Sequence, residues 1–292
     1  MGPHYPPRAA SPEIWVRHTS AVRARSAVFD LYGDHLATHD YWAPISGVIT
    51  LLESCGIAAP ATRTAVSRIT SQGWLEPRQR NSVRGYAATS LGRERLSEAW
   101  ERIYRVGSAE WDGRWQVVVT GRPRDRSQRD RVVGTLGFLG YGRLAPQTWL
   151  AARPPADLTS SLDALGIDYS TFTTTDLPAA REVVARTWDL AELAAGYRCF
   201  HEDTERLRDT VAGALSPAEA YPVRAALVHR WRKFLFVDPA LPVEVLPDDW
   251  PGAAARALFL EVADRLLPPA RIFVSEVLAS AGAQTPTQEP PS

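Results

Sequence analysis

The sequence predicts an α+β protein of several domains, and three changes of pattern along its 292 residues carry that prediction. Helical periodicity dominates residues 23–105, and a βαββαβ order of strands and helices follows over residues 110–177. Residues 178–278 show no strand pattern and contain helical segments separated by turns. A chain of this length is long for one hydrophobic core, so two or three domains are expected. The proline-rich ends, residues 1–22 and 279–292, lack periodicity and are expected to be disordered tails.

The first domain is expected to contain three helices, a hairpin and a further helix. Apolar residues of the first helix recur at helical spacing: Val28, Leu31, Tyr32 and Leu36. The second helix repeats this pattern over residues 48–55 and ends at Gly56. After a short turn, Pro60 suits the first turn of a third helix, where its missing N–H is not needed. This order is typical of helix-turn-helix proteins, whose second helix enters the major groove of DNA.

Arginines in residues 61–86 (ATRTAVSRITSQGWLEPRQRNSVRGY) are sorted onto one helix face and one hairpin. At 100° per residue, the apolar residues of the third helix share one face, and the other face carries the side chains expected to reach base edges: Arg63, Thr64, Ser67, Arg68 and Ser71. A hairpin, or wing, turning at Asn81 and Ser82 carries the arginines expected to reach phosphate: Arg78, Arg80 and Arg84. The alternative is a solvated surface in an arginine-rich chain, since Lys233 is its only lysine. The conjunction of helix order, short turn, sorted face and basic hairpin favours binding of double-stranded DNA.

The central region, residues 110–177, changes to a strand pattern. WQVVVT is a buried strand, GRLA and TWLAA flank Pro146 as a strand pair, and DYSTFTT is a final strand. Helices are expected at residues 125–139 and 158–165. This βαββαβ order is the signature of a ferredoxin-like sandwich. Three helical segments follow it: residues 197–215, 218–236 and 250–267.

The composition limits the classes of partner. With 33 basic and 33 acidic residues the chain has no net charge, so binding to nucleic acid needs local charge asymmetry. The two cysteines, Cys55 and Cys199, fit neither a disulfide nor a metal spacing, and a reducing cytoplasm is the simpler expectation. No run approaches the roughly 18 apolar residues of a membrane span. A cytoplasmic protein without membrane contact, metal or cofactor is expected.

Several runs resemble one family of regulators. RSAVFDLYGDHL, GVITLLESCGI and TRTAVSRITSQGWLEPR resemble the N-terminal winged helix of the PaaX-type repressors of phenylacetic acid degradation. VHRWRKFLFVDPALPVEVLPDDWPG, followed by AAARALFLEV, is similar to that family's C-terminal signature. Two positions depart from the family pattern: Ala58 stands where a serine usually caps the recognition helix, and NSVRG replaces a glycine-containing wing tip.

The resemblance, which covers residues 25–267, implies a winged helix-turn-helix, a central ferredoxin-like domain for dimerisation and coupling, and a helical C-terminal domain. It implies a homodimeric repressor of palindromic operators that phenylacetyl-coenzyme A, or another acyl-coenzyme A, releases from DNA. The candidate effector site is the densest basic cluster outside the winged helix: His229, Arg230, Trp231, Arg232 and Lys233. Its cations would pair with phosphates and its aromatic residues with an aryl group. Alternatively, Trp231, Phe234 and Phe236 are core residues, and the cations lie on the opposite face or at an interface.

No catalytic residue is expected. The chain lacks a glycine-rich phosphate loop, HExxH and GxSxG. Consecutive residues on a helix point in different directions, so His201, Glu202 and Asp203 cannot all face one ion. The alternative is a metal-dependent nuclease, because small CRISPR-adaptation nucleases have a similar central domain with an aspartate near the end of the first strand. Asp125 is the corresponding candidate, and Arg122 beside that position opposes cation binding.

Overall fold

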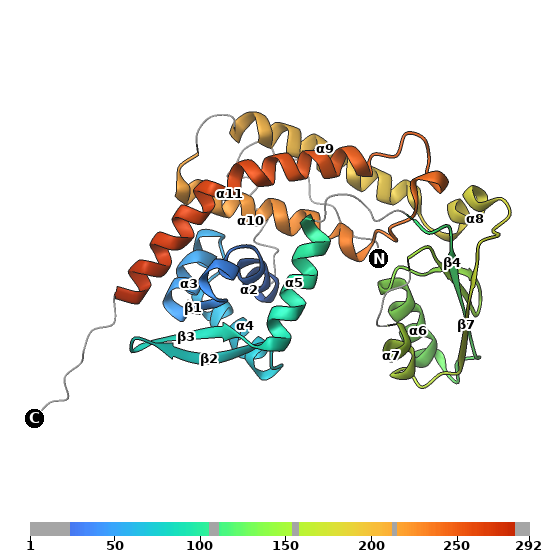
Figure 1. Ribbon diagram of the computed structural model, residues 1–292, viewed down its shortest axis with the longest axis horizontal. Helices are drawn as coiled ribbons and strands as arrows, with labels where there is room; N and C mark the ends of the chain where they lie inside the picture. Colours follow the sequence, from blue (N-terminus) through green and yellow to red (C-terminus); the bar gives the residue numbers. More distant parts are fainter. Residues whose placement is uncertain (1–23, 105–110, 154–157, 212–214, 284–292) are drawn as a thin grey trace, which may run out of the picture. The chain divides into compact units, whose positions relative to one another are not determined.

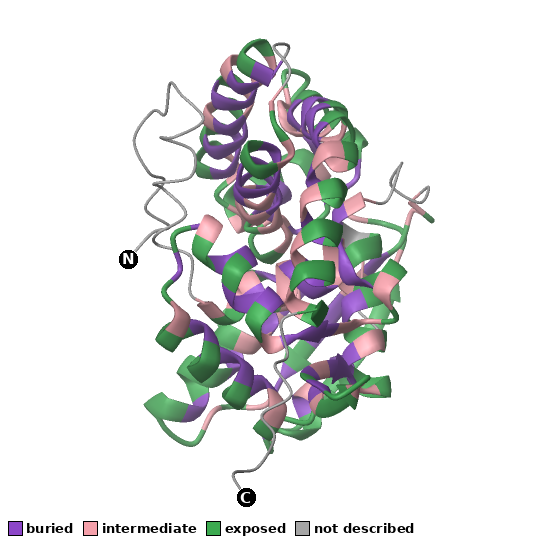
Figure 2. Cartoon of the chain, turned by 90° about the vertical axis from the view of Figure 1, so that its left-hand side faces the viewer, coloured by how far each residue is buried: buried purple, intermediate pink, exposed green. Residues whose placement is uncertain are grey.

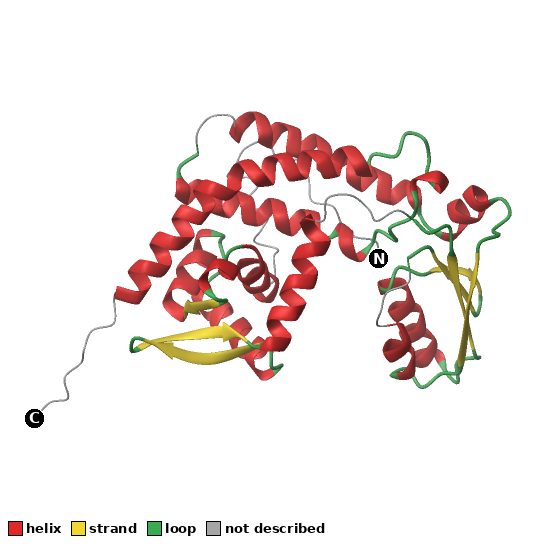
Figure 3. Cartoon of the chain, viewed as in Figure 1, coloured by secondary structure: helices red, strands yellow, loops and turns green. Residues whose placement is uncertain are grey.

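The computed structural model confirms the α+β class: helices and two small antiparallel sheets make up the chain (Figure 3). It describes residues 24–104, 111–153, 158–211 and 215–283. The expected N-terminal tail and the last residues of the expected C-terminal tail, 284–292, lie outside these ranges. Within the described residues, no helix combines the length and apolar character needed to cross a membrane.

The chain forms two compact units, each assembled from separate segments. Unit 1 comprises the described residues of Met1–Arg105, Cys199–Arg232 and Ala254–Ser292. Unit 2 comprises those of Val106–Arg198 and Lys233–Ala253. The expected C-terminal domain, residues 178–278, therefore falls partly in each unit, because residues 199–232 and 254–278 group with the N-terminal helices.

The N-terminal part of unit 1 contains four α-helices and a three-stranded sheet (Figure 1). The helices are α2 (Ala24–Asp34), α3 (Ile45–Ser54), α4 (Ala59–Ser71) and α5 (Ser90–Tyr104), with a 3-10 turn, η2 (Leu36–His39), after α2. The strands are β1 (Trp42–Pro44), β2 (Leu75–Arg80) and β3 (Val83–Ala88), in the antiparallel order β1-β3-β2. The sequence predicted the hairpin of β2 and β3 but not β1.

Three helices from the second half of the chain contribute to unit 1. They are α9 (Leu190–Val211), α10 (Pro217–Arg232) and α11 (Gly252–Ala283), the first and last of which begin in unit 2. Tyr221 of α10 and Ala270, Val274 and Leu278 of α11 are buried in the same core as the apolar faces of α2, α3 and α4. Figure 2 shows that buried and exposed residues alternate along the helices.

Helix α11 continues beyond its expected end near residue 267. It passes through Pro268 and Pro269 and reaches Ala283, into the expected tail from residue 279. Proline in a helix interior removes a hydrogen bond and costs about 3 kcal/mol. Burial of Ala270, Val274 and Leu278 in the core offsets that cost, because each fully buried apolar side chain contributes about 1.5–3 kcal/mol.

Unit 2 is built around a four-stranded antiparallel sheet with the order β5-β6-β4-β7. Its elements are β4 (Trp115–Thr120), α6 (Arg126–Phe138), β5 (Gly142–Ala145), β6 (Thr148–Ala151), α7 (Leu158–Asp163), β7 (Tyr169–Thr174), α8 (Ala180–Thr187), η3 (Phe234–Phe236) and η4 (Val243–Val245). Val118 of β4 faces the core formed with α6 and α7. Trp115 and Val117 face the opposite core, which α8 and residues 241–246 complete. The four strands lie where the sequence predicted them.

Candidate nucleic-acid interface

A shallow groove between α4 and the β2–β3 hairpin brings together arginines from three elements. Arg63 of α4, Arg78 of β2 and Arg84 of β3 line a depression of about 640 Å³, with Val66 and Tyr86 among its other lining residues. The five residues predicted to reach base edges are all exposed, whereas Ala65 and Ile69 of the same helix are buried in the core. The structure thus places Arg63 of the predicted helix face and two arginines of the wing around one concave surface, whereas the other four predicted helix residues are exposed outside its lining.

The turn before α4 sets the position of this helix. Gly56 adopts the left-handed conformation, with φ 78°, and Ile57 N–H donates to the Leu52 carbonyl at 3.0 Å, which closes the end of α3. Ala58 is the N-cap of α4 and provides no side-chain hydrogen bond, while Pro60 occupies the first turn. The predicted turn and Pro60 position are confirmed, and the missing cap agrees with the departure noted at Ala58.

The hairpin is closed by a two-residue turn and supported by β1. Asn81 and Ser82 both have positive φ, 46° and 65°, as a type I′ turn requires. From β1, the Trp42 indole N–H donates a hydrogen bond to the Arg78 carbonyl of β2 at 2.9 Å. A Cβ at Gly85 would lie 2.4 Å from the Ala43 carbonyl oxygen, so only glycine permits β1 to pack this closely. These contacts hold the hairpin against β1.

The three wing arginines differ in their partners. Arg78 forms an ion pair with Glu76 at 2.6 Å, and Arg80 pairs with Asp40 at 2.5 Å. Arg84 of the wing and Arg63 of α4 are both exposed, and within the described residues neither forms an ion pair. Exposed ion pairs contribute only about 0–1 kcal/mol, so Arg78 can exchange Glu76 for phosphate at low cost.

A buried ionic network joins α2 to α10. The Asp34 carboxylate accepts hydrogen bonds from Arg224 Nε and Nη2, both at 2.7 Å, and from the Tyr104 hydroxyl at 2.7 Å. Arg224 also donates to the Ala263 carbonyl of α11. Burial opposes ionisation of Asp34, but Arg224 outweighs it and holds the pKa of that carboxyl below its usual range. Sequence reasoning missed this network, because its members gave no local signal.

Two of the predicted effector cations form a second set of ion pairs between α10 and α2. His229 Nδ1 lies 3.2 Å from Asp30 Oδ2, and Arg232 Nε lies 3.1 Å from Asp30 Oδ1. The side chains of His229 and Arg232 are only 12% and 16% exposed, so they face α2 rather than solvent. Their charges are directed at Asp30.

The other members of the predicted effector cluster have separate surroundings. Arg230 donates to Asp203 Oδ2 at 2.7 Å. Trp231 is buried, 3% exposed, and stacks on Phe259 with ring centroids 4.8 Å apart. Lys233 belongs to unit 2. The cluster therefore contains a core tryptophan and three cations held in ion pairs, which agrees with the alternative interpretation except that Phe236 is exposed.

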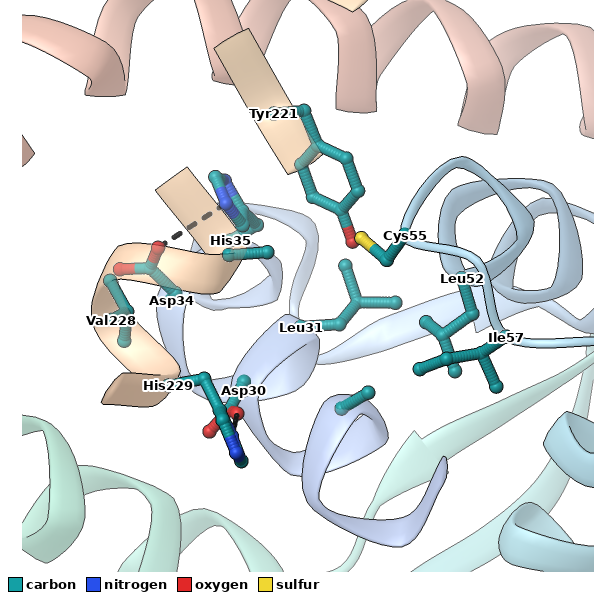
Figure 4. Close-up of a pocket in the computed structure, with 12 residues that line it drawn as sticks. Asp30, Leu31, Asp34, His35, Leu52, Cys55, Ile57, Tyr221, Val228 and His229 are labelled. Atoms are coloured by element: carbon teal, nitrogen blue, oxygen red, sulfur yellow. Dashed lines mark hydrogen bonds and ion pairs between the residues drawn. The ribbon is translucent and has the colours of Figure 1, made fainter. Parts of the chain in front are cut away.

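A small cavity lies beside the network, between α2, α3 and α10 (Figure 4). Its volume is about 30 Å³, which suits a water molecule rather than an acyl-coenzyme A. The Tyr221 hydroxyl and the Cys55 sulfur approach each other at its wall, and His35 lies near Asp34 (Figure 4). Burial lowers the pKa of His35 to about 4 and raises that of the Cys55 thiol to about 12.

The two acidic groups considered for metal binding have structural partners. Asp125 caps α6 by accepting a hydrogen bond from Gln128 N–H at 2.7 Å. Asp203 pairs with Arg230 and Arg206, while His201 lies 3.6 Å from Glu205. Within the described ranges no group of three or more His, Cys, Asp or Glu side chains could hold a metal ion.

These features define an α+β protein whose candidate site is a basic groove between a helix and a hairpin. The chain belongs to the PaaX family. Residues 23–90 match the model of the PaaX-like protein, residues 108–185 the PaaX protein central Cas2-like domain, and residues 188–276 the PaaX-like protein C-terminal domain. This confirms the resemblance inferred from the sequence.

Two known proteins are similar over most of the chain. The Transcriptional repressor PaaX of Escherichia coli (strain K12) is 31% identical over 268 residues, which is 87% of this chain and 84% of that protein. The solved structure of an uncharacterized protein, Rv0674, from Mycobacterium tuberculosis is 25% identical, with a TM-score of 0.56. That match covers 87% of this chain and all of the other.

Proposed function

We propose that the protein is a sequence-specific, DNA-binding transcriptional repressor whose N-terminal part is a winged helix-turn-helix. The observation that carries the proposal is the groove where exposed arginines of α4 and of the hairpin converge. The name of the Escherichia coli relative, a transcriptional repressor, supports it. Duplex DNA presents base edges to a helix in its major groove and phosphate on either side, which is the chemistry this groove offers.

In the proposed mechanism, α4 reads bases and the wing holds the backbone. Arg63 and Arg68 are long enough to pair with guanine, and Thr64 and Ser67 keep the helix face narrow. The wing contacts flanking phosphate through Arg84 and its neighbours. Two protomers bind a palindromic operator, and the ferredoxin-like arrangement of unit 2 serves dimerisation and coupling.

A comparison of Arg63→Ala with Arg84→Ala tests this division of roles. Both arginines are exposed and line the same groove, so each is a control for the other. Arg84→Ala is expected to weaken all duplexes equally and to reduce the salt slope of binding by about one. Arg63→Ala is expected to reduce discrimination by about 1–3 kcal/mol at one operator position. Identical behaviour would contradict the roles, and a wild-type chain without sequence preference would contradict the function.

The proposed effector is an acyl-coenzyme A such as phenylacetyl-coenzyme A, and the position of its site is open to two assignments. The His229–Lys233 cluster would have to give up ion pairs to bind phosphate, which weakens that assignment. A depression of about 650 Å³ within unit 2 has the size usual for ligand sites. Half-buried Trp188 and Trp250 line it together with exposed Arg186. We therefore favour the depression.

Titration of phenylacetyl-coenzyme A against the protein–operator complex tests the assignment. Trp188→Ala and Arg186→Ala are expected to raise the concentration needed for release, and Arg232→Ala is the matched variant in the other cluster. If only Arg232→Ala fails to release the operator, the effector site lies in the His229–Lys233 cluster instead. Release also requires a ligand that favours one conformation over another, since equal affinity for both shifts nothing.

The nuclease alternative is not favoured. Asp125 is engaged as a helix cap, with Arg124 and Arg126 on either side of it in the chain. A magnesium-dependent cleavage assay on duplex DNA distinguishes the alternatives, with Asp125→Asn as the variant because asparagine keeps the cap. Cleavage by the wild type that is lost in Asp125→Asn would contradict the proposed repressor function and support the nuclease alternative.

A further inference from the structure

Unit 2 carries a second concentration of arginines that the groove in unit 1 does not include. It lies in the loop after β4 and the first turns of α6, and we name it the arginine surface. Its members are Arg122, Arg124, Arg126, Arg129 and Arg131, all exposed. The same ten-residue stretch contains two acids, so five positive and two negative groups leave a net charge of +3. In a chain without net charge, such a local excess of positive charge indicates a site for an anionic partner.

Neither acid neutralises the arginine surface effectively. The Asp125 carboxylate is directed at a backbone N–H of α6 as a cap. Asp130 lies 3.7 Å from Arg126, and both side chains are more than half exposed, which makes this a weak pair. In the part of the chain that the structure describes, Arg122, Arg129 and Arg131 have no ion pair. Their charges are available to a partner.

A buried glutamine fixes the shape of the loop. Gln128 is 1% exposed, and its Oε1 accepts hydrogen bonds from Arg124 N at 2.8 Å and Arg124 Nε at 3.4 Å. Its Nε2 donates to the Leu165 and Gly166 carbonyls at 3.2 and 3.1 Å. These hydrogen bonds hold the Arg124 side chain in one orientation, so binding of a partner costs less conformational entropy.

The distribution of the arginines favours an extended polyanion over a single small anion. At 100° per residue, Arg129 and Arg131 are separated by about 160° around α6, with the buried positions Val132 and Leu136 between them. One phosphate cannot contact both, whereas successive phosphates of a nucleic acid backbone can. Guanidinium groups bind such oxygens strongly, often through two parallel hydrogen bonds.

We propose that the arginine surface is a sequence-independent contact for the phosphate backbone of duplex DNA. This inference rests on the proposed repressor function and adds to it a second DNA contact in unit 2. It predicts that α4 and the wing account for only part of the salt dependence of binding. The arginine surface would contribute affinity to every sequence and discrimination to none.

The test is the salt dependence of DNA binding by the full chain in which Arg122, Arg124 and Arg129 are all replaced by Gln. Each lost phosphate contact lowers the slope of log Kobs against log salt by about 0.9, so the slope is expected to fall by roughly 2.7. The affinity advantage of the wild type should then shrink about 40-fold between 50 and 200 mM salt. The loss should be equal for operator and unrelated duplexes. Replacement of the same residues by Lys should retain the slope.

A matched control removes three ion-paired arginines elsewhere: exposed Arg181 and Arg265, and half-buried Arg208. Its slope should stay at the wild-type value, which excludes an effect of net charge alone. If the Gln variant binds the operator with an unchanged slope, the arginine surface has no role and the groove in unit 1 suffices. If the wild type binds no duplex, the repressor function fails together with this inference.

Discussion

The buried ring of His35 predicts that unit 1 loses stability in mild acid. His35 is 4% exposed, and within the described residues neither ring nitrogen makes a hydrogen bond, although Nε2 lies 3.3 Å from Asp34 Oδ2. Burial lowers its pKa from 6.5 to about 4, against the attraction of Asp34. At about 1.36 kcal/mol for each pH unit, this difference corresponds to about 3 kcal/mol.

The sign follows from proton uptake. Below pH 6.5 the unfolded chain binds a proton at His35, whereas the folded chain does so only near pH 4. The free energy of unfolding therefore falls as the pH drops through this window, and His35 contributes no further loss below it. His35 therefore lowers the free energy of unfolding in acid and has no such effect at about pH 7.

Urea unfolding at about pH 7 and about pH 4.5, followed by circular dichroism, measures the effect. Between these conditions the wild type is expected to lose about 2–3 kcal/mol more than His35→Leu, which cannot take up the proton. His39→Gln, at a less buried position four residues on, is the matched control and should behave like the wild type. An equal pH dependence in the wild type and His35→Leu would refute a neutral, buried imidazole.

Three further predictions concern the scaffold of the groove. Ser82→Gly should raise the free energy of unfolding by up to about 1 kcal/mol, because serine is strained at φ 65°. Asn81→Gly should raise it by less, because asparagine tolerates positive φ better than serine does. Urea unfolding of both variants measures the difference. Ala58→Ser should stabilise α4 by about 1 kcal/mol by capping it, seen as slower hydrogen exchange in its first turn, and no change would contradict an open cap. Arg224→Ala should cost about 3–5 kcal/mol, because it leaves Asp34 charged and buried, and a loss below 1 kcal/mol in urea unfolding would show that the pair is exposed to water.

The candidate groove could be predicted from the sequence because its features are local. The sorted face of α4 and the two-residue turn at Asn81 and Ser82 depend on residues within one helix or one hairpin. The strand β1 escaped prediction, since three residues ending in Pro44 carry no strand periodicity and their pairing depends on close approach to Gly85. Helix α11 was predicted too short, since packing in the core outweighs the local effect of Pro268 and Pro269.

The ionic network could not be predicted, for a different reason. Asp34 and Arg224 are 190 residues apart, and nothing in either local pattern specifies the other. The ion pairs of the predicted effector cluster could not be predicted for the same reason. A run of cations reads as a free basic patch until the fold shows that Asp30 and Asp203 face it.

The energy of this network limits how the proposed effector can act. Separating α2 from α10 would break the buried pair of Asp34 and Arg224, at about 3–5 kcal/mol. Coupling free energies between a ligand and a second site are typically about 1–3 kcal/mol. An effector of ordinary strength therefore leaves α2 and α10 together, and it would release DNA by changing the spacing of two intact heads in the proposed dimer. Faster hydrogen exchange in α2 on addition of the effector would contradict this mechanism, because it would show that the head itself opens.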